Sequence, residues 1–271
     1  MAKYIAILLF LTALIQAHST PTPQDVIEGL IGTWVGTSTA NVNGNVIKES
    51  FTETITPIGT DGLGYQSTVI GYIGNQAPTT GVSYAYNNGQ LDGEISQNGN
   101  TTAVINGSWY VANSTIYGSA TAQTATTSFS ESTQTFVTGD TLNGVVSYSF
   151  GGGAVITAKK ILTPVVSFSL PEYTLAYSPN GNFPLNATSP SAGSITYSSD
   201  DPSVVSVSGH TATVKGVGTA TITASVAAAG YYTSASSSAD VTVTAVTPIV
   251  SFPQSALNIM RGLGIWSQCE G

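Results

Sequence analysis

Paired carboxylates are the residues of this chain whose types and spacing could do chemistry. Glu49 and Glu53 are four residues apart in one strand-like segment, and Asp92 and Glu94 are two apart in another. Side chains alternate between the two faces of a strand, so each pair points to a single face. Two carboxylates about 5–10 Å apart can hydrolyse a glycoside. The other interpretation, which we prefer, places both pairs on the polar outer face of their strands.

Histidine and cysteine are nearly absent from the chain. Histidine occurs only at His18 and His210, and cysteine only at Cys269. Residues 32–161 therefore contain neither, which excludes Ser-His-Asp and Cys-His catalysis there, and ordinary zinc or copper sites. We expect a protein that is not an enzyme, with no catalytic residue, no metal and no cofactor.

Aromatic rings are the better lead to a function. They could line a small apolar pocket or stack on a sugar, and they could equally fill a core. The partner would then be a small apolar molecule, a glycan or another surface ligand. The rings that we select as candidate ligand-binding residues are Tyr84, Tyr86, Trp109 and Tyr148.

Short strands must position these side chains. Residues 32–161 contain about ten strand-like runs separated by turns such as Asn43-Gly44 and Asn98-Gly99, which suit tight hairpins. Consecutive hairpins form an antiparallel meander, and a meander of about 8–10 strands closes into a barrel because closure removes its exposed edges. Before it, residues 18–31 form a leader whose apolar residues at 26, 27, 30 and 31 predict a short helix.

The segment that follows this helix carries a short motif. Gly32-Thr33-Trp34, at the start of the first strand, resembles the Gly-x-Trp of the calycin superfamily of lipocalin-like barrels. The resemblance implies that Gly32 and Trp34 plug the closed end of a barrel over residues 32–161. It also implies that a basic residue of the last strand, Lys159 or Lys160, covers the tryptophan in place of the usual arginine. Alternatively, Trp34 is an ordinary core aromatic.

A seven-residue segment occurs twice, at Leu162–Phe168 and Val246–Phe252, 84 residues apart. Seven short strands fit between the copies, which is the number in an immunoglobulin-like sandwich. The segments 195–207 and 214–224 resemble the signature of group 2 bacterial immunoglobulin-like domains. The resemblance implies that residues 162–245 are such a domain, used as a stalk at a cell surface or in a secreted protein.

The second copy of the repeat is too short to form another domain. We expect residues 246–271 to be an incomplete second repeat, left by a reading frame that is truncated or shifted near residue 253. The alternative is a native terminus that is partly disordered.

The first residues read as an export signal. Lys3 precedes an apolar run over residues 4–15, and Ala17 is a small residue at the expected cleavage point, so residues 1–17 form a predicted signal peptide. The alternative is an uncleaved N-terminal anchor. No later run is long and apolar enough to insert in a membrane. With 14 acidic and 6 basic residues and no basic patch, the chain is a poor partner for nucleic acid or anionic membrane surfaces.

The sequence thus predicts an all-β protein, secreted or at a cell surface, and three functions stay open. We prefer a non-enzymatic protein whose barrel is displayed on an immunoglobulin-like stalk, for adhesion or for binding a small ligand or a glycan. The second is a secreted carbohydrate-active hydrolase that uses the paired carboxylates. The third is a purely structural repeat protein with a filled barrel. A carboxylate that faces a cleft beside a second carboxylate would favour the hydrolase.

Overall fold

The computed structural model describes residues 23–59, 64–112 and 114–247. They divide into two compact units, one that ends at Thr163 and also includes Tyr231–Thr233, and one that begins at Pro164. The predicted signal peptide (1–17), the first part of the leader (18–22) and most of the incomplete repeat (248–271) lie outside the described residues.

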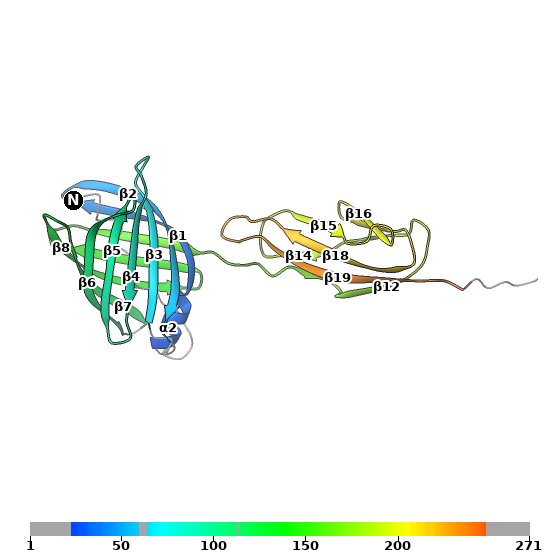
Figure 1. Ribbon diagram of the computed structural model, residues 1–271, viewed down its shortest axis with the longest axis horizontal. Coiled ribbons are helices and arrows are strands. Elements are labelled where there is room, and N and C mark those ends of the chain that lie inside the picture. The colour runs from blue at the N-terminus through cyan, green and yellow to red at the C-terminus, as the bar shows by residue number, and fades with distance from the viewer. Residues whose placement is uncertain (1–22, 60–63, 113, 248–271) are drawn as a thin grey trace, which may run out of the picture. The chain divides into compact units, whose positions relative to one another are not determined.

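Ten antiparallel strands of the first unit form a closed barrel (Figure 1). Each strand pairs with the next along the chain, and the last pairs with the first. This topology fits the lipocalin-like barrel that the sequence predicted. The strands are β1 (Gly32–Val42), β2 (Asn45–Ile58), β3 (Gly64–Tyr72), β4 (Thr79–Ala85), β5 (Gln90–Gln97), β6 (Asn100–Ala112), β7 (Thr115–Gln123), β8 (Ser128–Thr138), β9 (Thr141–Tyr148) and β10 (Gly153–Lys160).

Local sequence explains the tight connections. Asn43 and Gly44 both have positive φ, of 50° and 82°, as do Asn98 and Gly99, of 53° and 77°. Two consecutive positive φ values define the hairpin turn whose twist matches that of the flanking strands. These turns set the register of β1 with β2 and of β5 with β6.

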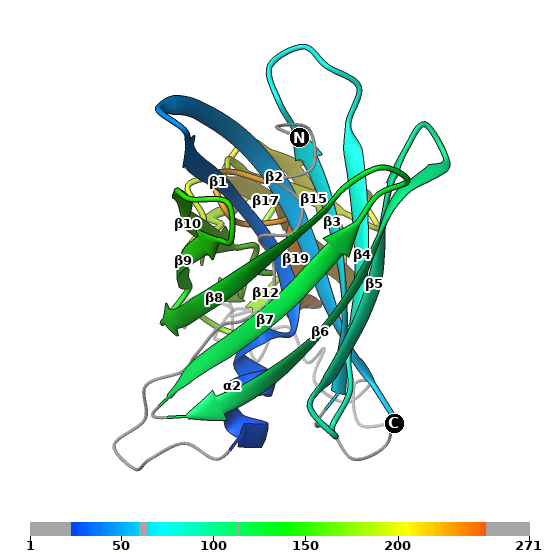
Figure 2. The same cartoon turned by 90° about the vertical axis from the view of Figure 1, so that its left-hand side faces the viewer.

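Helix α2 (Pro23–Leu30) lies at one end of the barrel (Figure 2). Its apolar side chains belong to the barrel's core cluster. Beside it Trp34 is fully buried, and its Nε1 donates a hydrogen bond of 2.8 Å to the carbonyl oxygen of Leu30. Lys160 covers this tryptophan, with Nζ 5.5 Å from the ring centroid and donating to the carbonyl oxygen of Gly29 at 3.0 Å. No helix among the described residues is long and apolar enough to cross a membrane.

The second unit is built from shorter strands. A four-stranded sheet, a three-stranded sheet and a two-stranded pair make up its framework. Both larger sheets contribute to one apolar core, with Val205 and Ala212 from one and Ile222 and Val241 from the other. The immunoglobulin-like identity of this unit stays a prediction. The sheets are β12 (Glu172–Ala176), β19 (Ala235–Thr244), β18 (Gly218–Val226) and β15 (Ile195–Ser199); β13 (Asn182–Pro184), β17 (Thr211–Val214) and β16 (Val205–Ser208); and β11 (Ser167–Phe168) with β14 (Ala187–Thr188).

Candidate ligand site inside the barrel

Three carboxyl side chains are buried on the inner face of the barrel wall. Glu49, Glu53 and Glu131 are only 4%, 2% and 4% exposed. Along β2 the buried positions alternate, so both glutamates share their face with Phe51 and Ile55. The expectation that Glu49 and Glu53 lie on the outer face of their strand is therefore wrong. The two apolar residues between and after them mark this as the inner face.

Glu49 and Glu131 both influence the same buried hydroxyl, that of Tyr148. We call these two glutamates the carboxyl pair. Glu131 on β8 lies directly opposite Tyr148 on β9 in the ladder, and both are buried. Burial raises the pKa of the Tyr148 hydroxyl, and the charges of Glu131 and Glu49 raise it further. Tyr148 therefore links two glutamates that are 82 positions apart in the sequence.

Each member of the carboxyl pair has a buried oxygen without a hydrogen-bond partner. These atoms are Oε2 of Glu49 and Oε2 of Glu131, and the Thr133 hydroxyl on the same face of β8 is likewise unpartnered. Burial raises the pKa of Glu49 to about 7 and that of Glu131 well above its usual range. Near neutral pH Glu49 can therefore exchange a proton with a bound molecule.

A second polar group lies nearer to the helix-covered end. Glu53 is paired with Trp34 in the ladder, and the Ser67 hydroxyl donates to its Oε1 at 2.6 Å. Burial raises the pKa of Glu53 to about 7, although the Ser67 hydrogen bond acts in the opposite direction. Four residues of strand separate Glu49 from Glu53, or about 13 Å at 3.3 Å per residue. The barrel interior therefore contains two distinct polar levels.

The neighbouring Tyr65 adds an unpartnered donor to this second level. Its hydroxyl is buried without a hydrogen-bond partner, and its ring packs edge-on against Trp109 with centroids 5.6 Å apart. The charge of Glu53, together with burial, raises the pKa of Tyr65.

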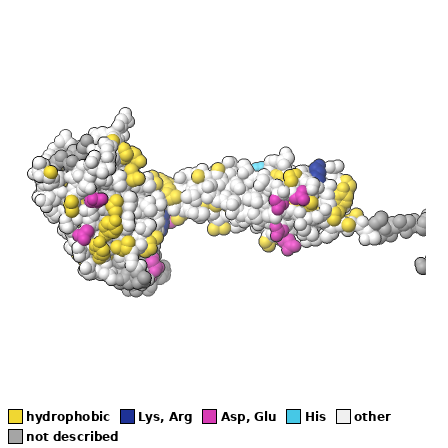
Figure 3. Space-filling view, in the orientation of Figure 1, with side chains coloured by type: hydrophobic (Ala, Val, Ile, Leu, Met, Phe, Trp, Pro, Cys, Tyr) yellow, Lys and Arg dark blue, Asp and Glu magenta, His cyan; other side chains and the backbone are white. Residues whose placement is uncertain are grey.

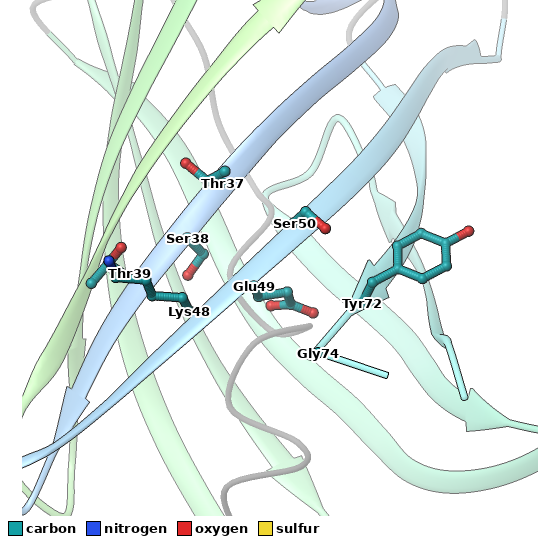
Figure 4. Close-up of a pocket in the computed structure, with 8 residues that line it drawn as sticks. All are labelled: Thr37, Ser38, Thr39, Lys48, Glu49, Ser50, Tyr72 and Gly74. Carbon is teal, nitrogen blue, oxygen red and sulfur yellow. The ribbon is translucent and has the colours of Figure 1, made fainter. Parts of the chain in front are cut away.

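A pocket of about 470 Å³ lies beside Glu49 (Figure 4). It forms where the pairing of β2 with β3 stops at Ser50 and Tyr72, so that the stretch of β2 containing Glu49 lacks a neighbour on that side. Lys48 runs toward Thr39 and away from the Glu49 carboxylate, as Figure 4 shows. The residues that line the pocket are Thr37, Ser38, Thr39, Lys48, Glu49, Ser50, Tyr72 and Gly74.

The four aromatic residues predicted to bind a ligand are not brought together. Trp109 and Tyr148 are buried on the inner face. Tyr84 of β4 and Tyr86, which follows this strand, lie on the outer face, stacked with centroids 6.5 Å apart. Trp109 Nε1 donates to the carbonyl oxygen of Tyr86 at 2.9 Å, so the polar atom of this indole is already bonded to the barrel backbone. Of the four, Tyr148 is the one beside the carboxyl pair.

The other two predicted carboxylates lie outside. Asp92 accepts a hydrogen bond from Gln90 at 2.8 Å and Glu94 accepts one from Thr101 at 3.1 Å, on a barrel surface with few charged side chains in the view of Figure 3. They make no cleft with the carboxyl pair. The predicted plug residues Gly32 and Trp34 lie at the helix-covered end, where a Cβ on Gly32 would touch the Lys160 side chain.

Sequence reasoning missed Glu131. Its strand reads as polar, because serine, threonine and glutamine fill the stretch from 130 to 135. The available signal was the even spacing of Phe129, Glu131 and Val137, which places the carboxyl on the face of two buried apolar residues.

No protein-family model and no curated protein matches this sequence. Similar solved structures include the following three. The first is that of Rv2717c from M. tuberculosis, at 12% identity and a TM-score of 0.39, covering 52% of this chain and 99% of the other. The second is the S-type phycobiliprotein lyase CPES from Guillardia theta, at 11% identity and a TM-score of 0.37, covering 53% and 94%. The third is the polysaccharide lyase BACCELL_00875, at 11% identity and a TM-score of 0.20, covering 79% and 40%.

One sequence-based prediction needs correction. The chain was expected not to be an enzyme, and the positions of its carboxyl groups overturn the reasoning behind that expectation. The expectation relied on the missing histidine and cysteine and on carboxylates assigned to the outer face. Glu49 and Glu53 are in fact buried inside the barrel with raised pKa values, so that reasoning does not hold.

Proposed function

We propose that the barrel binds a small molecule in its interior, with Glu49 and Glu131 as polar anchors. The observation that carries the proposal is the pair of buried carboxyl oxygens without partners. Leaving a buried polar group unsatisfied costs about 1–3 kcal/mol, so such groups in a native protein call for an explanation. A ligand that completes these hydrogen bonds supplies it.

The surroundings of the pair fit such a ligand. Tyr148 stacks on Phe150 with centroids 5.2 Å apart, and Phe150 meets Phe129 edge-on at 5.8 Å. Small-molecule sites are mostly apolar and aromatic, with a few placed polar groups that fix orientation. A wall of three rings beside two carboxyl groups has this composition.

A binding screen of the full-length chain tests the proposal. We expect small molecules that bind with one-to-one stoichiometry by calorimetry. Their affinity should fall about tenfold or more in Glu131→Gln and in Glu49→Gln, since each loses a charge-assisted hydrogen bond. Glu94→Gln, which removes an outer-face carboxylate, is the matched control and should bind normally. Binders that ignore both inner substitutions, or a screen without any one-to-one binder, would refute the proposal.

Acid–base catalysis on the bound molecule is the second candidate. It is favoured by the pKa of Glu49, about 7, because a general acid or base works best when its pKa lies near the ambient pH. Glu131, whose pKa burial raises well above its usual range, would act as the acid. Mass spectrometry of each binder after incubation tests this function. Turnover that disappears in Glu49→Gln while binding persists supports it, and binders recovered unchanged contradict it.

We further propose that the chain is exported, to be secreted or held at a cell surface, and that residues 162–245 form an immunoglobulin-like stalk for adhesion or display. The support is the signal-peptide pattern of residues 1–17, the resemblance of segments 195–207 and 214–224, and the single core shared by two sheets in the second unit. N-terminal sequencing of the protein from its own host tests export. A mature chain should begin at His18, and a cell-internal chain that keeps Met1 would contradict export.

A further inference from the structure

We infer that the molecule held by the carboxyl pair is an organic cation, with an ammonium or amidinium group between Glu49 and Glu131 and an aromatic or apolar body against Tyr148. This inference rests on the proposed function and names the ligand class of the same site. It follows from the hydrogen-bonding capacity of the site, from its unmatched charge and from its aromatic wall.

The site offers mainly acceptors. A bound cation favours the ionised form of the carboxyl groups beside it, and an ionised carboxylate only accepts hydrogen bonds. Oε2 of both glutamates is buried without a donor. The hydroxyl of Thr133 can accept as well, and it too is unpartnered. An ammonium group carries three donors and no acceptor, and an amidinium presents a planar fork that matches a carboxylate. A cationic head can thus complete the hydrogen bonds of all three side chains.

The described lysines are directed elsewhere. Lys48 runs toward Thr39 in Figure 4, and Lys160 donates to Gly29 at the helix-covered end. Lys159 donates to Thr141, and Lys215 donates to Asn180 in the second unit. Glu131 lies opposite Tyr148 in the ladder, and Glu49 is buried on the same inner face of the barrel, so the two carboxyl groups would repel each other when ionised. A cation from solution relieves this repulsion, which no neutral molecule of the same shape can do.

The ring of Tyr148 favours the same class of ligand. A cation near the face of a tyrosine is attracted by the ring quadrupole, and the attraction grows when water is excluded. Tyr148 is 6% exposed and lies opposite Glu131, so one ligand can contact the ring and the carboxyl together. The Phe150 and Phe129 rings extend this wall for an apolar body.

Three probes of one shape test the inference on the full-length chain by calorimetry. They are 2-phenylethylammonium, the neutral 2-phenylethanol and the anionic 3-phenylpropionate. We expect the ammonium to bind with one-to-one stoichiometry and the alcohol about tenfold or more weakly, because it donates only one hydrogen bond. Glu49→Gln and Glu131→Gln should each weaken the ammonium about tenfold or more, with Glu94→Gln as control. Having two inner variants keeps the test valid if one of them fails to fold.

The outcomes separate this inference from the proposed function. If the alcohol or the anion binds as well as the ammonium, and Glu131→Gln still weakens it, the barrel binds small molecules but the cation inference is wrong. If the ammonium does not bind while the wider screen finds a neutral ligand that depends on Glu131, the result is the same. If no compound depends on Glu49 or Glu131, both the inference and the proposed function fail.

Discussion

The two units differ in what they bury. Nine of the ten buried polar or charged side chains among the described residues belong to the barrel, and Ser191 is the exception in the second unit. The core of the second unit is made of aliphatic side chains such as Val205 and Ile222, edged by rings. An apolar interior of this kind stabilises a fold without offering chemistry. The barrel instead buries three carboxyl groups, which is why we place the proposed binding function there.

Within the barrel, the residues that close the helix-covered end differ in a similar way from the carboxyl pair. At the helix-covered end, the Trp34 indole and the Lys160 ammonium each have a backbone carbonyl as partner. At the carboxyl pair, Oε2 of Glu49 and Oε2 of Glu131 have none. Satisfied polar groups fix a structure, while unsatisfied ones are available to a ligand. The comparison between units and between levels yields four predictions.

The largest predicted effect is the pH dependence of stability, which should be seen in the barrel and not in the second unit. The folded-state pKa of Glu49 and of Glu53 is about 7 against an ordinary value of 4.5, so folding favours their protonated forms. Their contribution is fully present below pH 4.5 and is lost as the pH rises through 7. The loss is about 3 kcal/mol for each carboxyl at 1.36 kcal/mol per pKa unit.

Urea unfolding across this pH range measures the effect, with Trp34 and Trp109 reporting on the barrel. Glu53→Gln should make the pH dependence of the barrel shallower, because one titrating group is removed. A barrel that gains stability toward pH 8, or a second unit that loses as much, would sink this prediction.

Trp34→Ala should destabilise the barrel by about 3–5 kcal/mol, since it leaves a cavity where a large ring was fully buried. Trp34→Phe keeps most of the ring but removes the hydrogen bond to Leu30, and should cost about 1 kcal/mol for that bond alone. Thermal unfolding followed by circular dichroism measures both. The unfolding of the second unit should not change, and a shift there would show that the two units are not independent.

Ile222→Ala should have the converse effect, destabilising the second unit by about 2–5 kcal/mol through a cavity in its apolar core. Ile222→Val, the conservative control, should cost about 1 kcal/mol. Denaturation followed by circular dichroism gives the loss in this unit, with the barrel transition assigned separately by the fluorescence of Trp34 and Trp109. Barrel ligand affinity should stay the same in both variants, and weaker binding would contradict the assignment of function to the barrel.

Lys160→Met should produce the smallest change, a loss of about 1 kcal/mol from the barrel, because it removes a half-buried hydrogen bond and a cation beside an aromatic ring. Lys48→Met, at an exposed position, serves as the control and should change stability little. Chemical denaturation of the two variants side by side gives the difference. Equal stabilities would mean that Lys160 does not hold the helix-covered end.

The barrel was predictable because its signals are local. Asn43-Gly44 forces a tight turn through backbone sterics, and the alternation of Ile105, Gly107 and Trp109 selects an inner face within one strand. The spacing of apolar residues likewise predicted the short helix α2. The site was not predictable in the same way. On β2 the inner face carries two glutamates as well as Phe51. The assumption that charged side chains face solvent therefore assigned these glutamates to the wrong face.

By itself, the sequence determined the strands, their turns and the antiparallel meander, since each depends on neighbours a few residues apart. Only the tertiary structure decided that Glu49 on β2 and Glu131 on β8 act on the same Tyr148 hydroxyl. The physical reason is closure: when β10 pairs with β1, inner-face side chains from opposite walls enter one small interior, excluded from water. That exclusion raises the carboxyl pKa values and leaves their oxygens without partners.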